Sequence, residues 1–189
     1  MGMSYDDLVS EAAAVPPGSE GLVFLPYLTG ERTPHLDPSA TGAFIGLTAR
    51  HTRAHLTRAV MEGVVFALRD GIEVMRTIDV IPTEIRAIGG GASSNLWLQL
   101  QADVFGTPIH RMVVEEGAAY GAALLGHVTA GTFRDVDEAS AAVRTIAETT
   151  DPVGADVARY DEVYAVFHGL YGRLRDDMHR LAALDDVVD

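Results

Sequence analysis

The sequence predicts an α/β domain in which helices flank a mixed sheet. Short apolar runs with the length of strands alternate with longer segments whose apolar residues recur at helical spacing. One run, residues 85–88, ends in three glycines and is followed by Ser93 and Ser94, either of which can cap a helix. The 189 residues are 48% hydrophobic, enough to bury a core, so residues 1–189 are expected to form a single domain.

The first half of the chain predicts a short helix, a hairpin and a long helix. Residues 5–14 have helical spacing and are followed by a Pro-Pro-Gly run, which breaks helices. Residues 21–28 and 42–48 are expected to be strands that enclose a polar loop. Thr52 can cap a long helix over residues 53–78. The predicted apolar face of this helix comprises Leu56, Val60, Val64, Ala67, Leu68, Ile72 and Met75, and its small-residue stripe comprises Gly63, Ala67 and Gly71.

The second half predicts two strands and four helices. After the strand at residues 85–88 and its capped helix, residues 109–114 supply another short strand. A helix rich in small residues follows and ends near Gly131, and residues 136–148 are expected to form a peripheral helix. The small residues expected to form a packing surface are Gly117, Ala118, Gly121 and Ala122. The last helix, residues 158–184, carries an aromatic stripe of the kind that usually lies in a core.

The glycine run at residues 89–91 marks the candidate ligand site. Glycines let a ligand approach the main chain without intervening Cβ atoms, and the start of the next helix adds unpaired N–H groups and a positive dipole end. A phosphate or a nucleotide would suit such a corner. A turn that only packs a helix on a sheet has the same pattern, and on this motif alone that interpretation is favoured. The dinucleotide-binding fingerprint fits poorly because its third glycine is absent.

Composition and charge exclude several classes of function. The formal net charge is -13, which argues against nucleic-acid binding and against an anionic membrane surface, since both need a basic footprint. There is no cysteine and no apolar run of membrane-spanning length, so a cytoplasmic location is expected. The sequence contains arginine but no lysine, which excludes a Walker P-loop and a Schiff-base lysine within this chain.

Two histidines have the spacing of a metal pair. His51 and His55 stand four residues apart near the start of the long helix. No HExxH glutamate accompanies them, and His51 precedes the capping residue, so a solvated helix start is the favoured interpretation.

Several segments resemble the FGGY family of carbohydrate kinases. Residues 42–47, Gly-Ala-Phe-Ile-Gly-Leu, and residues 55–62, His-Leu-Thr-Arg-Ala-Val-Met-Glu, look like the two halves of that family's second signature, with the expected gap between them. Residues 24–35, Phe-Leu-Pro-Tyr-Leu-Thr-Gly-Glu-Arg-Thr-Pro-His, resemble its xylulokinase branch closely. The glycine run and residues 117–123 continue the resemblance, which covers residues 22–184 with its motifs in the family's order.

The resemblance implies the C-terminal, nucleotide-binding domain of an ATP-dependent sugar kinase with an actin-like, ribonuclease H-like fold. By the family pattern, Gly90, Gly91, Ala92 and Asn95 line the adenosine and α-phosphate side of ATP or ADP, and Mg²⁺ accompanies the nucleotide. The implied reaction converts D-xylulose and ATP to D-xylulose 5-phosphate and ADP. Another FGGY kinase, for ribulose, gluconate or glycerol, and a non-catalytic interaction or scaffold fragment are the alternatives.

The family carries its sugar site and its catalytic base on an N-terminal domain that this sequence does not contain. The resemblance therefore implies that no catalytic residue lies in this chain, that the pentulose is bound through the other domain, and that this polypeptide alone does not turn over. The C-terminal domain is also expected to be shortened on its N-terminal side. A sheet without its first strand has an unpaired edge, so self-association into a homo-oligomer is expected.

Two pairs of charged residues are secondary candidates. By their family position, Glu31 and Arg32 lie at the mouth of the cleft, where Arg32 either contacts the transferred phosphate or the interdomain surface, or forms an ion pair that only rigidifies the turn. Glu62 and Asp70, on the long helix, are expected to be helix-surface or hinge partners rather than catalytic acids.

Overall fold

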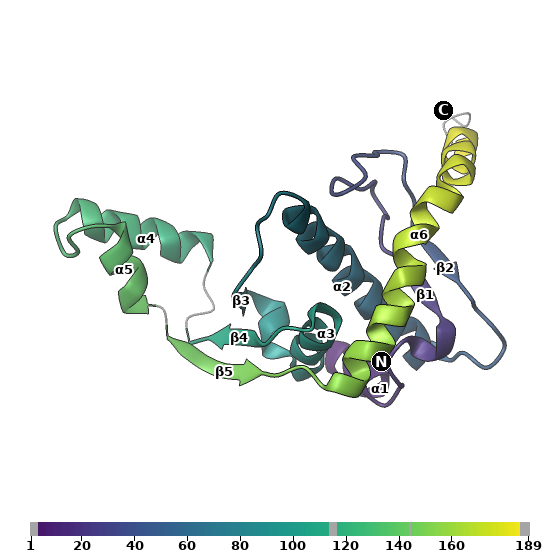
Figure 1. Ribbon diagram of the computed structural model, residues 1–189, viewed down its shortest axis with the longest axis horizontal. Coiled ribbons are helices and arrows are strands. Elements are labelled where there is room, and N and C mark those ends of the chain that lie inside the picture. Colours follow the sequence, from purple (N-terminus) through teal and green to yellow (C-terminus); the bar gives the residue numbers. More distant parts are fainter. Residues whose placement is uncertain (1–3, 114–116, 144, 186–189) are drawn as a thin grey trace.

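The computed structural model describes residues 4–113, 117–143 and 145–185, and shows an α/β fold (Figure 1). The helices are α1 (Tyr5–Ala13), α2 (Arg53–Thr77), α3 (Asn95–Phe105), α4 (Ala118–Thr129), α5 (Val136–Val143) and α6 (Gly154–Asp185), with short 3₁₀ turns η1 (Ser19–Gly21) and η2 (Gly90–Ser93). The strands are β1 (Val23–Leu25), β2 (Ala43–Ile45), β3 (Ile85–Ala87), β4 (Ile109–Met112) and β5 (Ile146–Thr150). The predicted elements are therefore present, and one strand is added to them.

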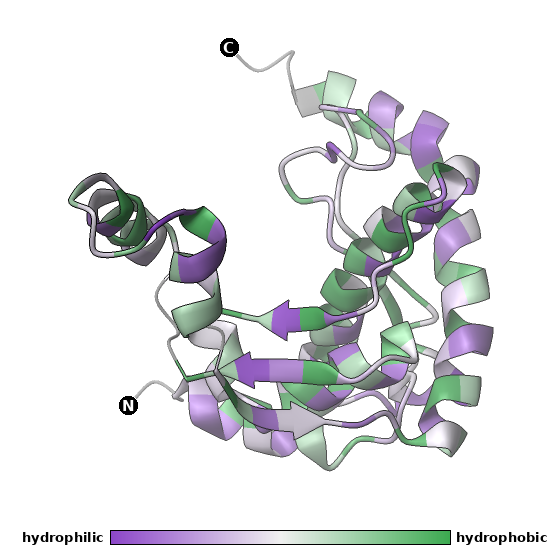
Figure 2. Cartoon of the chain, turned by 60° about the vertical axis from the view of Figure 1, so that its left-hand side comes forward, coloured by the Kyte–Doolittle hydropathy of each residue, from purple (hydrophilic) through white to green (hydrophobic). Residues whose placement is uncertain are grey.

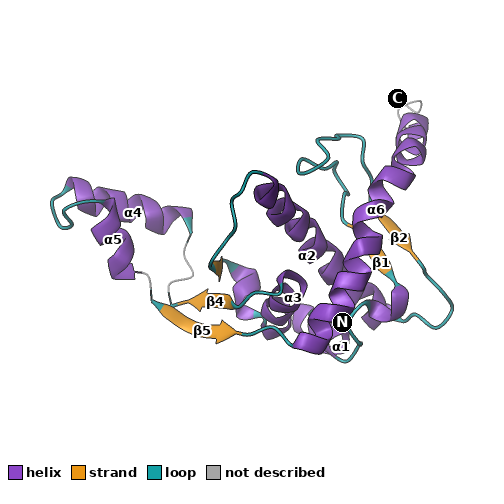
Figure 3. Cartoon of the chain, viewed as in Figure 1, coloured by secondary structure: helices purple, strands orange, loops and turns teal. Residues whose placement is uncertain are grey.

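The strands form two sheets, as Figure 3 shows in orange. Strands β1 and β2 pair antiparallel as the predicted hairpin. In the second sheet β3 runs parallel to β4, and β4 runs antiparallel to β5, in the order β3-β4-β5. The predicted mixed sheet flanked by helices is confirmed.

Strand β5 corrects the prediction of one helix over residues 136–148. Helix α5 ends at Val143, and Ile146–Thr150 pairs with β4 instead. The alanine-rich start of this segment favours a helix, whereas Ile146, Thr149 and Thr150 are β-branched and favour a strand. Pairing with β4 satisfies the backbone groups of this segment, so the tertiary contact decides its structure.

The main core lies between α2, α3, α6 and β1. Its largest fully buried side chains include Phe66 from α2 and Tyr160 and Phe167 from α6. The ring of Phe66 contacts both others, with 5.9 Å between its centroid and that of Tyr160 and 5.2 Å to that of Phe167. The predicted aromatic stripe on the last helix is thereby confirmed as core. A second, smaller cluster joins α3 to β3 and β4 and comprises Ala87, Ala92, Leu98, Ala102 and Ile109.

The apolar face predicted for α2 is wrong in part. Val60, Leu68 and Met75 are exposed, whereas the buried side of the helix is turned by about one residue and contains Met61 and Val65. That side also buries the charged residues Arg58, Glu62 and Asp70. A hydrophobicity pattern scores charged residues as surface, and here they are buried because other side chains satisfy them.

Gly63 shows why one member of the small-residue stripe is needed. A Cβ atom at Gly63 would lie 2.2 Å from the carbonyl oxygen of Phe24, so α2 crosses the main chain of β1 at this point without room for a side chain. An added Cβ at Gly71, by contrast, would meet nothing within 4 Å.

Helix α4 corrects the expectation of a packing surface after β4. Gly117, Ala118, Gly121 and Ala122 are all exposed, and no residue of α4 is buried. Figure 1 shows α4 and α5 together, apart from the other helices, and Figure 2 shows the largely hydrophobic colouring of this part. Within the described ranges, these four small residues are therefore exposed, and the neighbour of α4 is α5.

Candidate functional site

The glycine corner, residues 89–94, connects β3 to α3. Gly89 has φ of 77°, in the left-handed region where glycine is favoured. Two hydrogen bonds close the turn η2, which follows. The N–H of Ala92 donates to the carbonyl oxygen of Gly89 at 2.9 Å, and the N–H of Ser94 donates to the carbonyl oxygen of Gly91 at 3.1 Å. Ser94 is the N-cap of α3, and its Oγ accepts from the N–H of Trp97 at 3.3 Å. The strand, turn and capped helix predicted from the sequence are confirmed.

The corner is open to solvent. Gly90 and Gly91 are exposed, and a Cβ atom added at Gly90 would meet nothing within 4 Å. At Gly91 an added Cβ would lie 3.1 Å from Nε1 of Trp97, so this glycine also lets the turn pass the indole ring closely. The main chain of the corner is therefore accessible to a ligand, and not sealed beneath side chains.

A cavity of about 490 Å³ separates the corner from α1. Its lining comprises Tyr5, Asp6, Val9, Ser10, Ala13, Gly90, Ser93, Ser94, Asn95 and Leu96. One wall is a face of α1 that carries Tyr5, Val9 and Ala13 beside the polar Asp6 and Ser10, and the other is main chain and small polar side chains at the N-terminus of α3. The apolar part of the α1 wall suits a flat ring, and a helix N-terminus suits an anion, so the two ends of a nucleotide have complementary surfaces here.

Charge divides the cavity into two ends. Asp6 places a carboxylate on the α1 wall, in the first turn of that helix. A phosphate beside this carboxylate would be repelled, whereas beside the N–H groups of the corner it would be attracted. An anionic group is therefore expected against Gly90 and Ser93.

Ala92 and Asn95 occupy different environments. Ala92 is 1% exposed, and its side chain packs in the small core cluster, so only its main chain is near the corner surface. Asn95 is exposed and lines the cavity, and its Oδ1 accepts a hydrogen bond from Nη2 of Arg111 at 2.7 Å. The structure thus brings Gly90 and Asn95 to one cavity and turns the methyl group of Ala92 inward.

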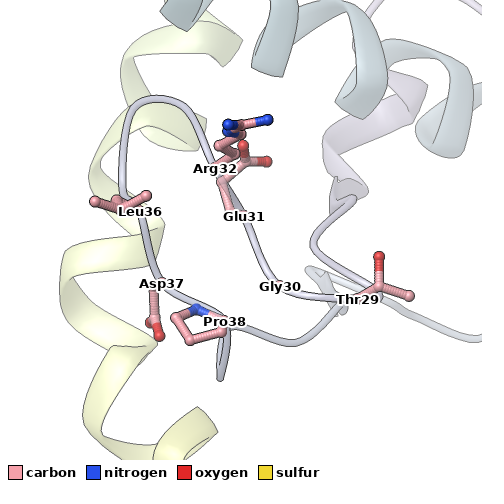
Figure 4. A pocket seen from close by; sticks show the side chains of 7 residues that line it. All are labelled: Thr29, Gly30, Glu31, Arg32, Leu36, Asp37 and Pro38. Carbon is pink, nitrogen blue, oxygen red and sulfur yellow. The ribbon is translucent and has the colours of Figure 1, made fainter.

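The loop of residues 29–38 forms a second, separate cavity of about 510 Å³ (Figure 4). Glu31 and Arg32 both line it, and Figure 4 shows their side chains on the same side of the loop. Oε1 of Glu31 accepts from the N–H of Thr33 at 2.8 Å. Among the ion pairs of the described residues there is none between Glu31 and Arg32, so the alternative in which this pair rigidifies the turn is not what the structure shows. Arg32 is exposed.

Asp37 fastens this loop to α6. Its Oδ2 accepts hydrogen bonds from the hydroxyl of Tyr171 at 2.8 Å and from Nε2 of His179 at 2.7 Å. His35, in the same loop, stacks on the ring of Tyr171 with 3.7 Å between centroids. The hydrogen bonds from His179 and Tyr171 lower the pKa of Asp37 from 3.8 to about 2.

The attachment through Asp37 predicts a pH dependence. A carboxylate with a lowered pKa stabilises the fold above its ordinary pKa, and that contribution is lost as the pH falls from about 3.8 to about 2. The melting temperature of the wild-type chain should therefore fall more steeply over this window than that of Asp37→Asn, which cannot ionise. Thermal unfolding followed by circular dichroism between pH 2 and 5 measures the two slopes, and equal slopes would contradict the prediction.

Glu62 and Asp70 are buried, which corrects the expectation of a helix-surface position. They are 1% and 2% exposed. Glu62 accepts from the N–H of Gly18 at 2.9 Å. It also accepts from the hydroxyls of Ser19 and Tyr160 and from Nε of Arg58. Asp70 Oδ1 accepts from the hydroxyl of Tyr164 at 2.6 Å and is 2.7 Å from Nδ1 of His168. Both carboxylates therefore join α2 to α6, and neither lines the cavity of the glycine corner.

The histidine pair has a structural role. Nδ1 of His51 accepts from the N–H of Thr48 at 2.9 Å, and Nδ1 of His55 accepts from the N–H of Thr52 in the capping box of α2. In the parts of the chain that the structure describes, no three His, Asp or Glu side chains gather as metal ligands. Both histidines therefore lie at the start of α2 as predicted, but they are not solvated, because the His55 side chain is only 15% exposed and Nε2 of His51 is buried.

None of the helices in the described part of the chain combines the length and the apolar composition that crossing a bilayer requires.

Two parts of the site were missed from sequence. The α1 wall, with Tyr5 and Val9, lies on the predicted short helix, for which no part in the site is predicted from the sequence, although apolar residues at a spacing of four are its signal. Arg111 lies in a predicted strand and has no predicted role in the site, yet it is hydrogen-bonded to Asn95. A lone arginine in a strand gives no sequence signal for such a contact.

Comparisons with known proteins agree with this architecture. Residues 4–130 match the family model described as the FGGY family of carbohydrate kinases, C-terminal domain. The xylulose kinase of Staphylococcus epidermidis is 40% identical over 168 residues, which cover 89% of this chain and 34% of that protein. The chain spans about a third of the length of the curated relatives it matches.

Solved structures show the same fold. The ligand-bound xylulose kinase of Lactobacillus acidophilus superimposes with a TM-score of 0.84 at 30% identity, covering 94% of this chain and 36% of that one. The gluconate kinase of the same species gives a TM-score of 0.82 at 31% identity, covering 90% and 35%. These similarities extend over nearly the whole of the described chain.

Proposed function

Because the chain belongs to the FGGY family of carbohydrate kinases, as its C-terminal domain, we propose that it is the nucleotide-binding part of an ATP-dependent xylulokinase. The reaction would convert D-xylulose and ATP to D-xylulose 5-phosphate and ADP. The observation that carries this proposal is the open glycine corner, where Gly90 and the N-terminus of α3 face a cavity with an apolar wall. Its N–H groups would hold the phosphates, and the α1 wall would take the adenosine.

In this proposal Gly90, Gly91, the main chain of Ala92 and Asn95 contact ATP or ADP. The described residues do not provide a cluster of metal-ligating side chains, so the proposal assigns no magnesium ligand to this chain and no step to the metal. Glu31 and Arg32 line a separate cavity formed by their own surface loop. Their position in this loop is the only basis for proposing a role at the mouth of a cleft. The acidic net charge makes nucleic acid and anionic membranes unsuitable partners.

A second sugar is supported by one comparison. The similarity to a gluconate kinase structure is almost as high as that to a xylulose kinase structure. A kinase of the same family for gluconate is therefore the second candidate, and the cavity at the corner does not distinguish the two because it would bind the nucleotide that they share.

A nucleotide titration tests the proposal. The ¹⁵N-labelled chain is titrated with ADP, with and without magnesium, and amide shifts are followed. Shifts centred on residues 90–95 and on α1 support a nucleotide seat, and inorganic phosphate alone should shift only the corner. Absence of shifts at the corner up to millimolar ADP would instead favour a scaffold function.

Catalysis by this polypeptide alone is not part of the proposal. In-line phosphoryl transfer needs a base, a positioned sugar hydroxyl and held phosphates together. We propose that the base and the sugar contacts belong to the part of the relatives' length that this chain does not span. Release of ADP that depends on xylulose, catalysed by the purified chain, would refute this.

Strand β3 gives the basis for the proposed homo-oligomer. Within the described sheet, β4 lies on one side of β3 and no strand lies on the other. Beside that edge lies an apolar groove of about 380 Å³, lined by Leu68, Ile72, Ile85, Arg86, Ala87, Ile88, Trp97, Gln101 and Phe105. A free edge next to apolar surface favours pairing with a second copy.

Self-association should therefore rise with concentration and depend on this edge. Sedimentation velocity is expected to show a dimer that Ile88→Lys shifts toward monomer, because a charge beside an edge strand opposes pairing. Val166→Lys, at another exposed apolar position, is the matched control and should leave the dimer unchanged. The weakest association worth testing has a Kd of millimolar order, and it would already give some dimer at about 0.5 mM. A chain that stays monomeric at all concentrations up to about 0.5 mM would therefore overturn the proposal.

A further inference from the structure

Arg111 lies at the same sheet edge as the glycine corner. In the parallel pair β3 and β4, Arg111 stands directly opposite Ala87, the last residue of β3 before the corner. The carboxyl ends of parallel strands share one edge, where ligands of α/β proteins commonly bind. Arg111 is therefore close to the cavity, although it is not among the residues that line it.

The guanidinium of Arg111 is held between two neighbours. Its Nη2 donates to Oδ1 of Asn95 at 2.7 Å and is 3.2 Å from Oε2 of Glu148, the residue opposite it on β5. Its Nε is buried and has no hydrogen-bond partner among the described groups. The carboxylate of Glu148 offsets the positive charge, so Arg111 has less attraction for a phosphate than a free arginine would have.

The contact with Arg111 fixes which end of the Asn95 carboxamide faces which way. A guanidinium has only donors, so the group of Asn95 that meets it must be the oxygen. The NH₂ group is then the end that remains for the cavity, which Asn95 lines. Without this contact the carboxamide could turn and present its oxygen instead.

We propose that Arg111 is a positioning residue of the nucleotide seat. It holds Asn95 so that the side-chain NH₂ donates to an acceptor atom of the bound adenine nucleotide, and it does not itself contact the ligand. The inference rests on the proposed function, because it explains how Asn95 presents a hydrogen-bond donor to the bound nucleotide. Glu148 supports Arg111 from the other side.

A double-mutant cycle with ADP as the probe tests this assignment. Calorimetric titration compares the wild-type chain with Arg111→Ala, Asn95→Ala and the double variant. Loss of one hydrogen bond is expected to raise the Kd of ADP about 3- to 10-fold in each single variant. Because Arg111 acts through Asn95, the double variant should bind no more weakly than Asn95→Ala alone.

Two further variants keep the test independent of folding. Asn95→Asp still accepts from Arg111 but has no NH₂ group and adds a negative charge, so it should fold normally and bind ADP at least as weakly as Asn95→Ala. Arg134→Ala removes an equally charged arginine that is 82% exposed and should leave the Kd of ADP unchanged. In the wild-type chain the side-chain amide signal of Asn95 should shift when ADP is added, and in Arg111→Ala that shift should shrink.

Each outcome decides the matter. Losses that multiply in the double variant would mean that Arg111 contacts ADP directly, and an unchanged Kd in Arg111→Ala or in Asn95→Asp would mean that the contact has no role in binding. Either result overturns the inference while leaving the nucleotide seat in place. If the wild-type chain shows no ADP-induced shift at residues 90–95, the seat itself is refuted and the inference falls with it.

Discussion

Replacing Glu62 with alanine is expected to lower the free energy of unfolding by about 3–5 kcal/mol. The carboxylate of Glu62 accepts from Nε of Arg58 at 2.9 Å and from the hydroxyl of Tyr160 at 2.8 Å, inside the core. The substitution leaves the buried guanidinium of Arg58 without its carboxylate partner, which is the costly part of breaking a buried pair. Urea unfolding, followed by the fluorescence of Trp97, measures the loss.

Two variants separate this effect from a general effect of changing α2. Glu73→Ala removes a partly exposed carboxylate that pairs with Arg76 on the same helix and should cost less than about 1 kcal/mol. Replacing the pair together, with Arg58→Met and Glu62→Leu, should recover part of the stability, because no unpaired charge remains buried, although the N–H of Gly18 and the hydroxyls of Ser19 and Tyr160 still lose their acceptor. A loss for Glu62→Ala no larger than that for Glu73→Ala would show that the buried network is not stabilising.

Replacing Gly90 with alanine is expected to weaken ADP binding about tenfold or more without loss of stability. The added Cβ meets no protein atom within 4 Å, and Gly90 is not among the positive-φ residues, so the fold tolerates the methyl group. The methyl group would obstruct a phosphate that binds to the main-chain N–H groups. A loss of about 1.4 kcal/mol of binding free energy corresponds to a tenfold increase in Kd. Gly90→Glu should bind still more weakly, because its charge opposes the phosphate.

The matched control for Gly90 is Gly121, on α4. A Cβ at Gly121 also meets nothing within 4 Å, and no residue of its helix lines the cavity of the corner, so Gly121→Ala should not change the Kd of ADP. Calorimetric titration gives the Kd of each variant, and the melting temperature checks the fold. Wild-type affinity in Gly90→Ala would place the nucleotide elsewhere.

The elements that local signals control could be predicted from the sequence. The caps at Thr52 and Ser94 begin α2 and α3 where the sequence expects them, and Gly106, with a left-handed φ, ends α3. Strand β5 could not be predicted in the same way, because its pairing with β4 overrides the helical preference of the alanines before it. Because β5 is not predicted from the sequence, the cross-strand pair of Arg111 and Glu148 is not predicted either.

The site was only half visible for a similar reason. The glycine corner is contiguous in sequence, and its glycines are required by local geometry, so it could be identified from residues 89–91 alone. The α1 wall is about 80 positions earlier in the chain, and packing of α1 on α2 brings it there. Likewise the buried carboxylates of α2 accept hydrogen bonds from Tyr160 and Tyr164, which lie more than 90 positions later.

Three tyrosine hydroxyls of α6 each donate to a carboxylate from an earlier segment: Tyr160 to Glu62, Tyr164 to Asp70 and Tyr171 to Asp37. Ribosomes release a chain from its N-terminus, so α2 and the loop before it leave the exit tunnel while the segment with these hydroxyls has not yet been made. During that interval the acidic groups have no native donors from α6 and stay hydrated. We therefore expect the early part of the nascent polypeptide to remain protease-sensitive until the final helix has been translated.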